Sequence, residues 1–108
     1  MEKRKKTCNQ DEVTALSDAE VKELLLELPQ WSLRNKAIER EFRFRDFAEA
    51  IEFVNKLASL SETENHHPDI LISYNKVLVA LTTHKVAGLS CKDFILGAKI
   101  DRLTGCGR

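Results

Sequence analysis

The sequence has no surplus of positive charge. Its 17 Lys and Arg residues balance 17 Asp and Glu residues. Because a nucleic-acid-binding protein needs extra Lys and Arg to neutralise phosphates, this composition argues against nucleic acid as a partner. The one basic run, from Lys3 to Lys6, lies in a polar N-terminal stretch. A solvated tail is the simpler interpretation of this run, and contact with an acidic partner is the alternative.

The sequence also has no long hydrophobic run. No stretch approaches the ~20 apolar residues that a membrane-spanning helix needs. The charged N-terminus is not followed by an apolar segment of the kind found in signal peptides. We therefore expect a cytoplasmic protein without a membrane partner.

The cysteines form no metal-binding or redox motif. The chain has 3 of them, Cys8, Cys91 and Cys106, an odd number without CxxC spacing. Free thiols in a reducing cytosol are the simplest account of such a set. Cys8 and Cys106 lie near the ends of the chain, where a site would be poorly held, so we expect no catalytic cysteine.

The apolar content of the chain is sufficient for one core. Hydrophobic residues make up 43% of the 108 residues, and this length is typical of a single domain. We expect a flexible polar tail over residues 1–16, a single domain over residues 17–104 and a short C-terminal tail over residues 105–108.

Two helices are predicted from capping residues followed by apolar residues at three- and four-residue steps. The first begins after Ser17 and ends before Pro29, because proline cannot continue a helix. The second begins after Asp46 and runs to about Leu60. This end would place Glu62 in the loop that follows the helix.

A third helix is predicted after Ser90, with Asp93 as its capping partner. Its apolar residues form two stripes on opposite sides. The stripes consist of Phe94, Ile95 and Ala98 on one side and Leu96, Ile100 and Leu103 on the other. One stripe can pack on a sheet, and in a domain this small the other is expected to face a second subunit. We therefore predict a homodimer or homotetramer, with this helix or a neighbouring sheet edge at the contact.

Four strand-like stretches lie between the helices, over residues 31–33, 37–44, 70–74 and 77–83. Short turns join the first two stretches and the last two, so antiparallel pairing is expected within each pair. The order of elements is α-β-β-α-β-β-α. It predicts an α+β fold with a four-stranded antiparallel sheet and helices packed on one face.

All 3 histidines, His66, His67 and His84, fall near predicted strand ends, with Glu62 close by. Histidine gives or takes a proton near neutral pH because its reference pKa is ~6.5, so imidazoles beside a carboxylate suit general acid–base catalysis. Pro68 favours an extended His67, and adjacent residues in an extended chain point to opposite sides. His66 and His67 are therefore expected to approach a ligand differently.

The histidines have two possible roles other than catalysis. Zinc sites with three histidines exist, but adjacent ligands are geometrically awkward and the sequence has no HxH or HxxxH spacing. Alternatively, the histidines only satisfy hydrogen bonds at strand ends. We expect no metal here.

A longer pattern runs through the histidine unit. Its members are, in order, Glu62, His66, His67, Pro68, Tyr74, His84 and Asp93. This pattern resembles the signature of the pterin-4a-carbinolamine dehydratases, with every residue type and spacing matched. The likeness extends over roughly residues 15–103 and includes the segments 28–31, 44–47, 74–77 and 83–90.

The resemblance implies a hydro-lyase that dehydrates a 4a-hydroxytetrahydropterin to the quinonoid dihydropterin, a step of tetrahydrobiopterin recycling. An acid must protonate the leaving 4a-hydroxyl, and a base must take a proton from a pterin ring nitrogen. The pterin is the substrate, and the resemblance implies no further cofactor. Such a substrate forms when a pterin-dependent aromatic amino acid hydroxylase turns over, so a hydroxylase is the expected pathway partner.

The resemblance also implies the residues of the site. His66, His67 and His84 would carry the catalysis, with Glu62 in support. Contact with the pterin is implied for Asn65, His66, His67, Pro68, Thr82, Thr83, His84 and Lys85. Trp31 either walls the pocket or packs in the core.

A second class of function is implied as well. Animal members of the family bind a homeodomain transcription factor through the helical surface that they use for self-association. The alternative to an enzyme is therefore a protein-binding module, acting as a dimerisation cofactor, a transcriptional coactivator or an assembly factor.

Overall fold

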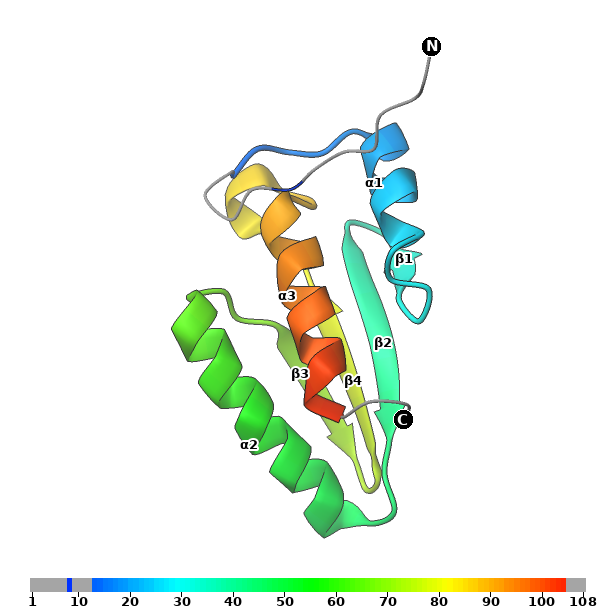
Figure 1. The fold of residues 1–108 in the computed structure, drawn as a ribbon, viewed down its shortest axis with the longest axis vertical. Coiled ribbons are helices and arrows are strands. Elements are labelled where there is room, and N and C mark those ends of the chain that lie inside the picture. The colour runs from blue at the N-terminus through cyan, green and yellow to red at the C-terminus, as the bar shows by residue number, and fades with distance from the viewer. Residues whose placement is uncertain (1–7, 9–12, 105–108) are drawn as a thin grey trace.

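The computed structural model describes residue 8 and residues 13–104, and it has the predicted order of elements (Figure 1). The elements are α1 (Asp18–Leu25), β1 (Ser32–Arg34), β2 (Ala37–Arg43), α2 (Phe47–Glu64), β3 (Asp69–Ser73), β4 (Lys76–Leu81), α3 (Cys91–Asp101) and two short 3-10 helices, η1 (His84–Val86) and η2 (Arg102–Thr104). The strands form one antiparallel sheet in the order β1-β2-β4-β3. The predicted α+β class is confirmed. The predicted tails lie mostly outside the described residues, so their boundaries stay a prediction.

One face of the sheet is apolar and forms one side of the hydrophobic core. Ile38 pairs with Leu81, and Phe42 pairs with Val77, across β2 and β4. These four side chains are buried, and paired residues in an antiparallel ladder share a face. The helices pack on this apolar face of the sheet, as predicted (Figure 1).

The predicted helix starts are found at Ser17, Asp46 and Ser90, whose side chains each accept a backbone N–H from the first turn. The end of α2 differs from the prediction. The helix continues to Glu64, because no Pro or Gly interrupts the sequence before Asn65 turns into the left-handed conformation. Glu62 therefore lies in the last turn of α2 and not in a loop.

Both apolar stripes of α3 are covered within the chain. Leu96 and Ile100 on one stripe are 1% and 0% exposed, and Phe94 on the other is 5% exposed. The helix lies over the sheet between α1 and α2 (Figure 1). Gly97 permits close packing here, because a Cβ at this position would lie 3.0 Å from Cδ1 of Leu28. The prediction that the second stripe faces another subunit is therefore wrong.

The homodimer or homotetramer itself stays a prediction, with the sheet edge as its remaining contact surface. β3 is an edge strand, and it carries exposed Leu71 and Ile72, with exposed Tyr74 in the adjoining turn. Apolar side chains on an unpaired strand favour association, so this edge fits a subunit contact better than α3 does.

Asp101 connects the C-terminal end of α3 to β2 and to Trp31, the residue before β1. Its Oδ1 accepts hydrogen bonds from Nε1 of Trp31 at 2.9 Å and from Nη1 of Arg40 at 2.6 Å. The Arg40 guanidinium also lies 4.2 Å from the ring centroid of Phe42. Trp31 is buried in the hydrophobic core, which supports the packing interpretation of this residue over a pocket wall.

The prediction of free thiols is wrong for two of the cysteines. Cys8 and Cys91 form a disulfide across 83 positions of sequence. Their Cα atoms are 5.2 Å apart, within the usual range for a disulfide. The spacing of the cysteines in the sequence does not show this proximity, because it arises only when the chain folds. Cys106 lies outside the described residues. A cytoplasmic location, for which free thiols were one argument, stays a prediction.

We expect Ile100→Glu to prevent folding. Ile100 is fully buried, and an unpaired carboxylate at such a position costs free energy comparable to the whole stability of a small domain. Circular dichroism and urea denaturation would measure the loss. Leu26→Glu is the matched control, because Leu26 is 76% exposed. A cooperative, native-like unfolding transition in Ile100→Glu would contradict the packing of α3.

Candidate active site

The turn after α2 positions two histidines. Asn65 adopts a left-handed conformation with φ of 54°. The N–H of Asn65 donates to the carbonyl of Glu62 at 3.3 Å, and the N–H of His66 donates to the carbonyl of Ser61 at 3.1 Å. These bonds satisfy carbonyls at the helix end and reverse the chain. His66 and His67 therefore follow at the junction of α2 and β3.

His66 is hydrogen-bonded to a carboxylate that is fully buried. Nε2 of His66 lies 2.6 Å from Oδ1 of Asp93, and the exposed fractions of these side chains are 13% and 0%. Oδ2 of Asp93 accepts from Oγ1 of Thr83 at 2.7 Å and from the N–H of Ser90 at 3.0 Å. Because a carboxylate only accepts, the Nε2–H of His66 donates to Asp93, and in the neutral ring the lone pair is then on Nδ1.

Two hydroxyl groups complete this network. Oγ1 of Thr83 and Oγ of Ser90 are 2.8 Å apart, and both residues are buried. Since the hydroxyl hydrogen of Thr83 goes to Asp93, the hydroxyl of Ser90 donates to Thr83. The network thereby joins the segment after β4, the first turn of α3 and the turn after α2. Its polar atoms are paired, which a buried carboxylate requires.

His67 has a carboxylate partner in a different setting. Its Nε2 lies 2.6 Å from Oε2 of Glu62, in the last turn of α2. The two side chains are 58% and 77% exposed. An exposed pair of this kind contributes little to stability, so its main effect is to orient the imidazole. His66 and His67 thus differ in burial and in partner, and their different approach to a ligand stays a prediction.

His84 lies directly after Thr83 and begins η1. Thr83 is held by an isolated bridge to Gly88, and Ala87 turns the chain with φ of 52°. The His84 side chain is exposed, and no hydrogen bond of its ring is present within residues 8 and 13–104. Through Thr83 and Asp93 the segment that carries His84 is linked to His66.

The remaining predicted contact residues differ in exposure and in their place in the fold. Asn65 and Lys85 are exposed, and Pro68 is half-buried. Oγ1 of Thr82 donates to the carbonyl of Lys36 at 2.7 Å and also lies 3.1 Å from the carbonyl of Gly88, so Thr82 supports the loop. Trp31 bonds Asp101, which is eight residues, or about 12 Å, along α3 from Asp93.

Asp93 and Ser90 were missing from the set of site residues that the sequence suggested. Asp93 had two signals: it closes the residue pattern that begins at Glu62, and it is the capping partner of Ser90. Neither signal shows that its other oxygen reaches His66, 27 positions away. That contact exists only because α3 begins beside the turn after α2.

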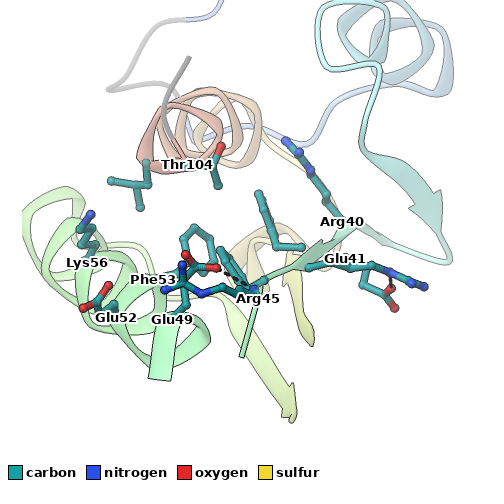
Figure 2. Close-up of a pocket in the computed structure, with 12 residues that line it drawn as sticks. Arg40, Glu41, Arg45, Glu49, Glu52, Phe53, Lys56 and Thr104 are labelled. Carbon is teal, nitrogen blue, oxygen red and sulfur yellow. Dashed lines mark hydrogen bonds and ion pairs between the residues drawn. The ribbon is translucent and has the colours of Figure 1, made fainter. Parts of the chain in front are cut away.

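A groove of about 710 Å3 lies elsewhere on the molecule, near the start of α2 and the end of α3 (Figure 2). It is lined by Arg40, Glu41, Phe42, Arg43, Phe44, Arg45, Glu49, Glu52, Phe53, Lys56, Leu103 and Thr104. None of the predicted site residues lines it. Phenylalanine rings form its apolar part, and charges of both signs surround them, so the groove has no dominant charge.

The part of the chain that the structure describes gives no metal centre and no membrane span. Within it, no group of three or more His, Cys, Asp or Glu side chains is placed to hold a metal ion. No helix in residues 13–104 is long and apolar enough to cross a membrane.

Comparison with known proteins decides the family. The model of the pterin 4 alpha carbinolamine dehydratase family matches residues 14–103. This chain belongs to the pterin-4a-carbinolamine dehydratase family. A Picosynechococcus protein with that name, provisionally assigned, is 51% identical over 90 residues, which cover 83% of this chain and 98% of the relative. A Chloroflexus aurantiacus protein with the same provisional name is 52% identical, with 83% and 97% covered.

Two solved structures named as a pterin dehydratase or as dehydratase-like have a similar fold. A transcriptional coactivator/pterin dehydratase from Brucella melitensis superposes with a TM-score of 0.80 at 33% identity, covering 84% of this chain and 99% of that one. A pterin dehydratase-like protein identified as a RuBisCO assembly factor in the alpha-carboxysome gives a TM-score of 0.59 at 25% identity, covering 69% and 87%. The family fold therefore occurs in proteins with an enzymatic name and in one with an assembly role.

We expect Asp93→Asn to destabilise the protein by about 1–3 kcal/mol. The substitution replaces one acceptor oxygen by an amide donor, so at least one of the hydrogen bonds from Thr83, Ser90 and His66 is lost in a buried site. Urea denaturation measures the change. Glu62→Gln is the control, because the Glu62–His67 pair is exposed and its loss should cost less than about 1 kcal/mol. Equal effects of the two substitutions would contradict the central role of Asp93.

Proposed function

We propose that this protein dehydrates a 4a-hydroxytetrahydropterin to the quinonoid dihydropterin by general acid–base catalysis. The carbon–oxygen bond at C4a breaks, and the hydroxyl group leaves as water after it gains a proton. A pterin ring nitrogen loses a proton, and its electron pair forms the new carbon–nitrogen double bond. The products are water and the quinonoid dihydropterin, so the reaction needs one acid and one base.

The observation that carries this proposal is the hydrogen bond between His66 and Asp93. The carboxylate accepts Nε2–H and so leaves the lone pair of Nδ1 available to take a proton. It also stabilises the imidazolium that forms when the proton arrives. His66 is therefore suited to act as the base.

The acid comes from the exposed imidazoles. His67 is oriented by Glu62, and His84 follows the residue that bonds Asp93. An exposed imidazole exchanges protons with water readily, so it can be protonated again after each turnover. Asn65, Pro68 and the segment from Thr82 to Lys85 border these rings in sequence and are proposed to contact the pterin.

The proposed substrate arises when a pterin-dependent aromatic amino acid hydroxylase turns over, which makes such an enzyme the proposed pathway partner in tetrahydrobiopterin recycling. The chemistry is proton transfer alone. We propose that it uses neither a metal nor a redox cofactor.

A protein-binding role is the second candidate, because two solved relatives carry the names of a transcriptional coactivator and an assembly factor. In that case a surface away from the histidines would carry the function. The exposed apolar residues of β3, Leu71 and Ile72, are the first candidates for such a surface.

We expect His66→Gln and His84→Ala each to lower the dehydration rate by about 10²-fold or more, the usual scale for a lost general acid or base. Glutamine at position 66 keeps a donor for Asp93 but cannot serve as a base near neutral pH. Stopped-flow spectroscopy of chemically generated 4a-hydroxytetrahydropterin measures the rate. Lys76→Ala, at the exposed first residue of β4, is the control.

Wild-type rates in both histidine variants would remove these side chains from the mechanism. The same assay after treatment with EDTA tests the absence of a metal. We expect an unchanged rate, and a loss of activity that zinc restores would favour a zinc site instead.

Binding of a reduced pterin distinguishes an enzymatic function from a protein-binding function. At a concentration about 100 times its Kd, 7,8-dihydrobiopterin should stabilise the folded protein by about 2.7 kcal/mol and raise the melting temperature by several degrees. The shift should shrink in His84→Ala and persist in Leu71→Lys. An unmoved melting temperature in the wild type at saturating pterin would argue for the protein-binding role.

A further inference from the structure

The disulfide between Cys8 and Cys91 lies beside the proposed catalytic network. Cys91 is the first residue of α3, directly after Ser90 and two positions before Asp93. Ser90, Cys91 and Asp93 are all fully buried. The bond therefore attaches a segment from the start of the chain to the helical turn whose carboxylate binds His66.

The same N-terminal segment is attached a second time, on the other side of Ser90. The N–H of Leu16 donates to the carbonyl of Leu89 at 2.9 Å. Cys8 and Leu16 are both partly buried against the hydrophobic core. The start of α3 is thus held by one hydrogen bond at Leu89, two residues before the helix, and by a covalent bond at Cys91, its first residue.

These two attachments differ in strength. A single backbone hydrogen bond opens readily, whereas a disulfide that closes a long loop removes much of the freedom of the unfolded chain. Cys8 is partly exposed and Cys91 is buried, so an incoming thiolate reaches the sulfur of Cys8 more easily. A reductant in solution can therefore reach and open the Cys8–Cys91 disulfide.

We propose that the Cys8–Cys91 disulfide is a redox-sensitive clamp on the turn that carries Asp93, opened by a dithiol reductant. A thiolate of the dithiol attacks Sγ of Cys8, the disulfide bond breaks, and Cys91 leaves as a thiolate that takes up a proton. The second thiol of the reductant then displaces Cys8 and closes a disulfide within the reductant. Two electrons pass to the protein, which gains two thiols.

Opening the clamp has a local and a global effect. The segment at Cys8 is released from α3, so the first turn of this helix opens more often and Asp93 becomes less well shielded from water. The loss of the cross-link also lowers the stability of the whole domain. Neither effect depends on the identity of the reaction that the site performs, so the inference stands apart from the proposed dehydration.

The test uses the full chain with Cys106→Ser, which leaves Cys8 and Cys91 as the only cysteines. Titration of thiols in denaturant should find none before treatment with dithiothreitol and two afterwards. Reduction of the native protein should lower the melting temperature by at least about 5 °C. Reduction should also increase the amide exchange rate at residues 92–94, and this increase should be at least about 10-fold larger than the increase at residues 77–81.

Cys8→Ser in the Cys106→Ser background is the matched variant. It should have the melting temperature and exchange of the reduced protein and should not respond to dithiothreitol. Two free thiols in the protein purified without reductant would overturn the proposal. So would a disulfide that forms but whose reduction changes exchange at residues 92–94 no more than elsewhere, because the bond would then stabilise the fold without controlling the site.

Discussion

A buried carboxylate with its full set of donors is the constraint on which this structure depends. Asp93 has no exposed surface, and its two oxygens accept hydrogen bonds from an imidazole, a hydroxyl and a backbone N–H. Burial of a charge is tolerated only when every partner is in place. The end of β4, the start of α3 and the turn after α2 must therefore meet correctly before the domain is stable, and the same meeting builds the candidate site.

The site combines two environments for the same side chain. His66 is nearly buried and held by a buried acid, whereas His67 is exposed and held by an exposed one. A reaction that needs a base and an acid can use this difference, because one imidazole is shielded by the protein and the other meets solvent. Adjacent positions in the sequence achieve this because one side chain faces the core and the next faces solvent.

Much of the fold was predictable because its signals are local. Capping residues such as Ser17 and Ser90 mark helix starts, and alternating apolar residues mark strands. The end of α2 was missed because the left-handed conformation of Asn65 is not a strong signal unless glycine occupies the position. The role of α3 was misread because periodicity shows that a helix has two apolar sides but not that a neighbour covers each of them.

The candidate site was predictable only in part, for the same reason. The histidines were identified from their chemistry and from the residue pattern around them. The partner of His66 is 27 positions away, and the partner of Cys8 is 83 positions away. Such pairs form only when helices and strands pack against one another, and the sequence of a single helix or strand does not show this packing. Asp93 was visible as a capping residue while its second contact was not.

The two carboxylates of α3 have a mechanical consequence. Asp93 is bonded to the loops at one end of the helix, and Asp101 is bonded to Trp31 and Arg40 at the other. A rod pinned at two points about 12 Å apart cannot slide along its axis or rotate without breaking bonds at both ends. A displacement of Trp31 or of β2 at one end would therefore move the helix as a rigid body, and the movement would reach the ring of His66.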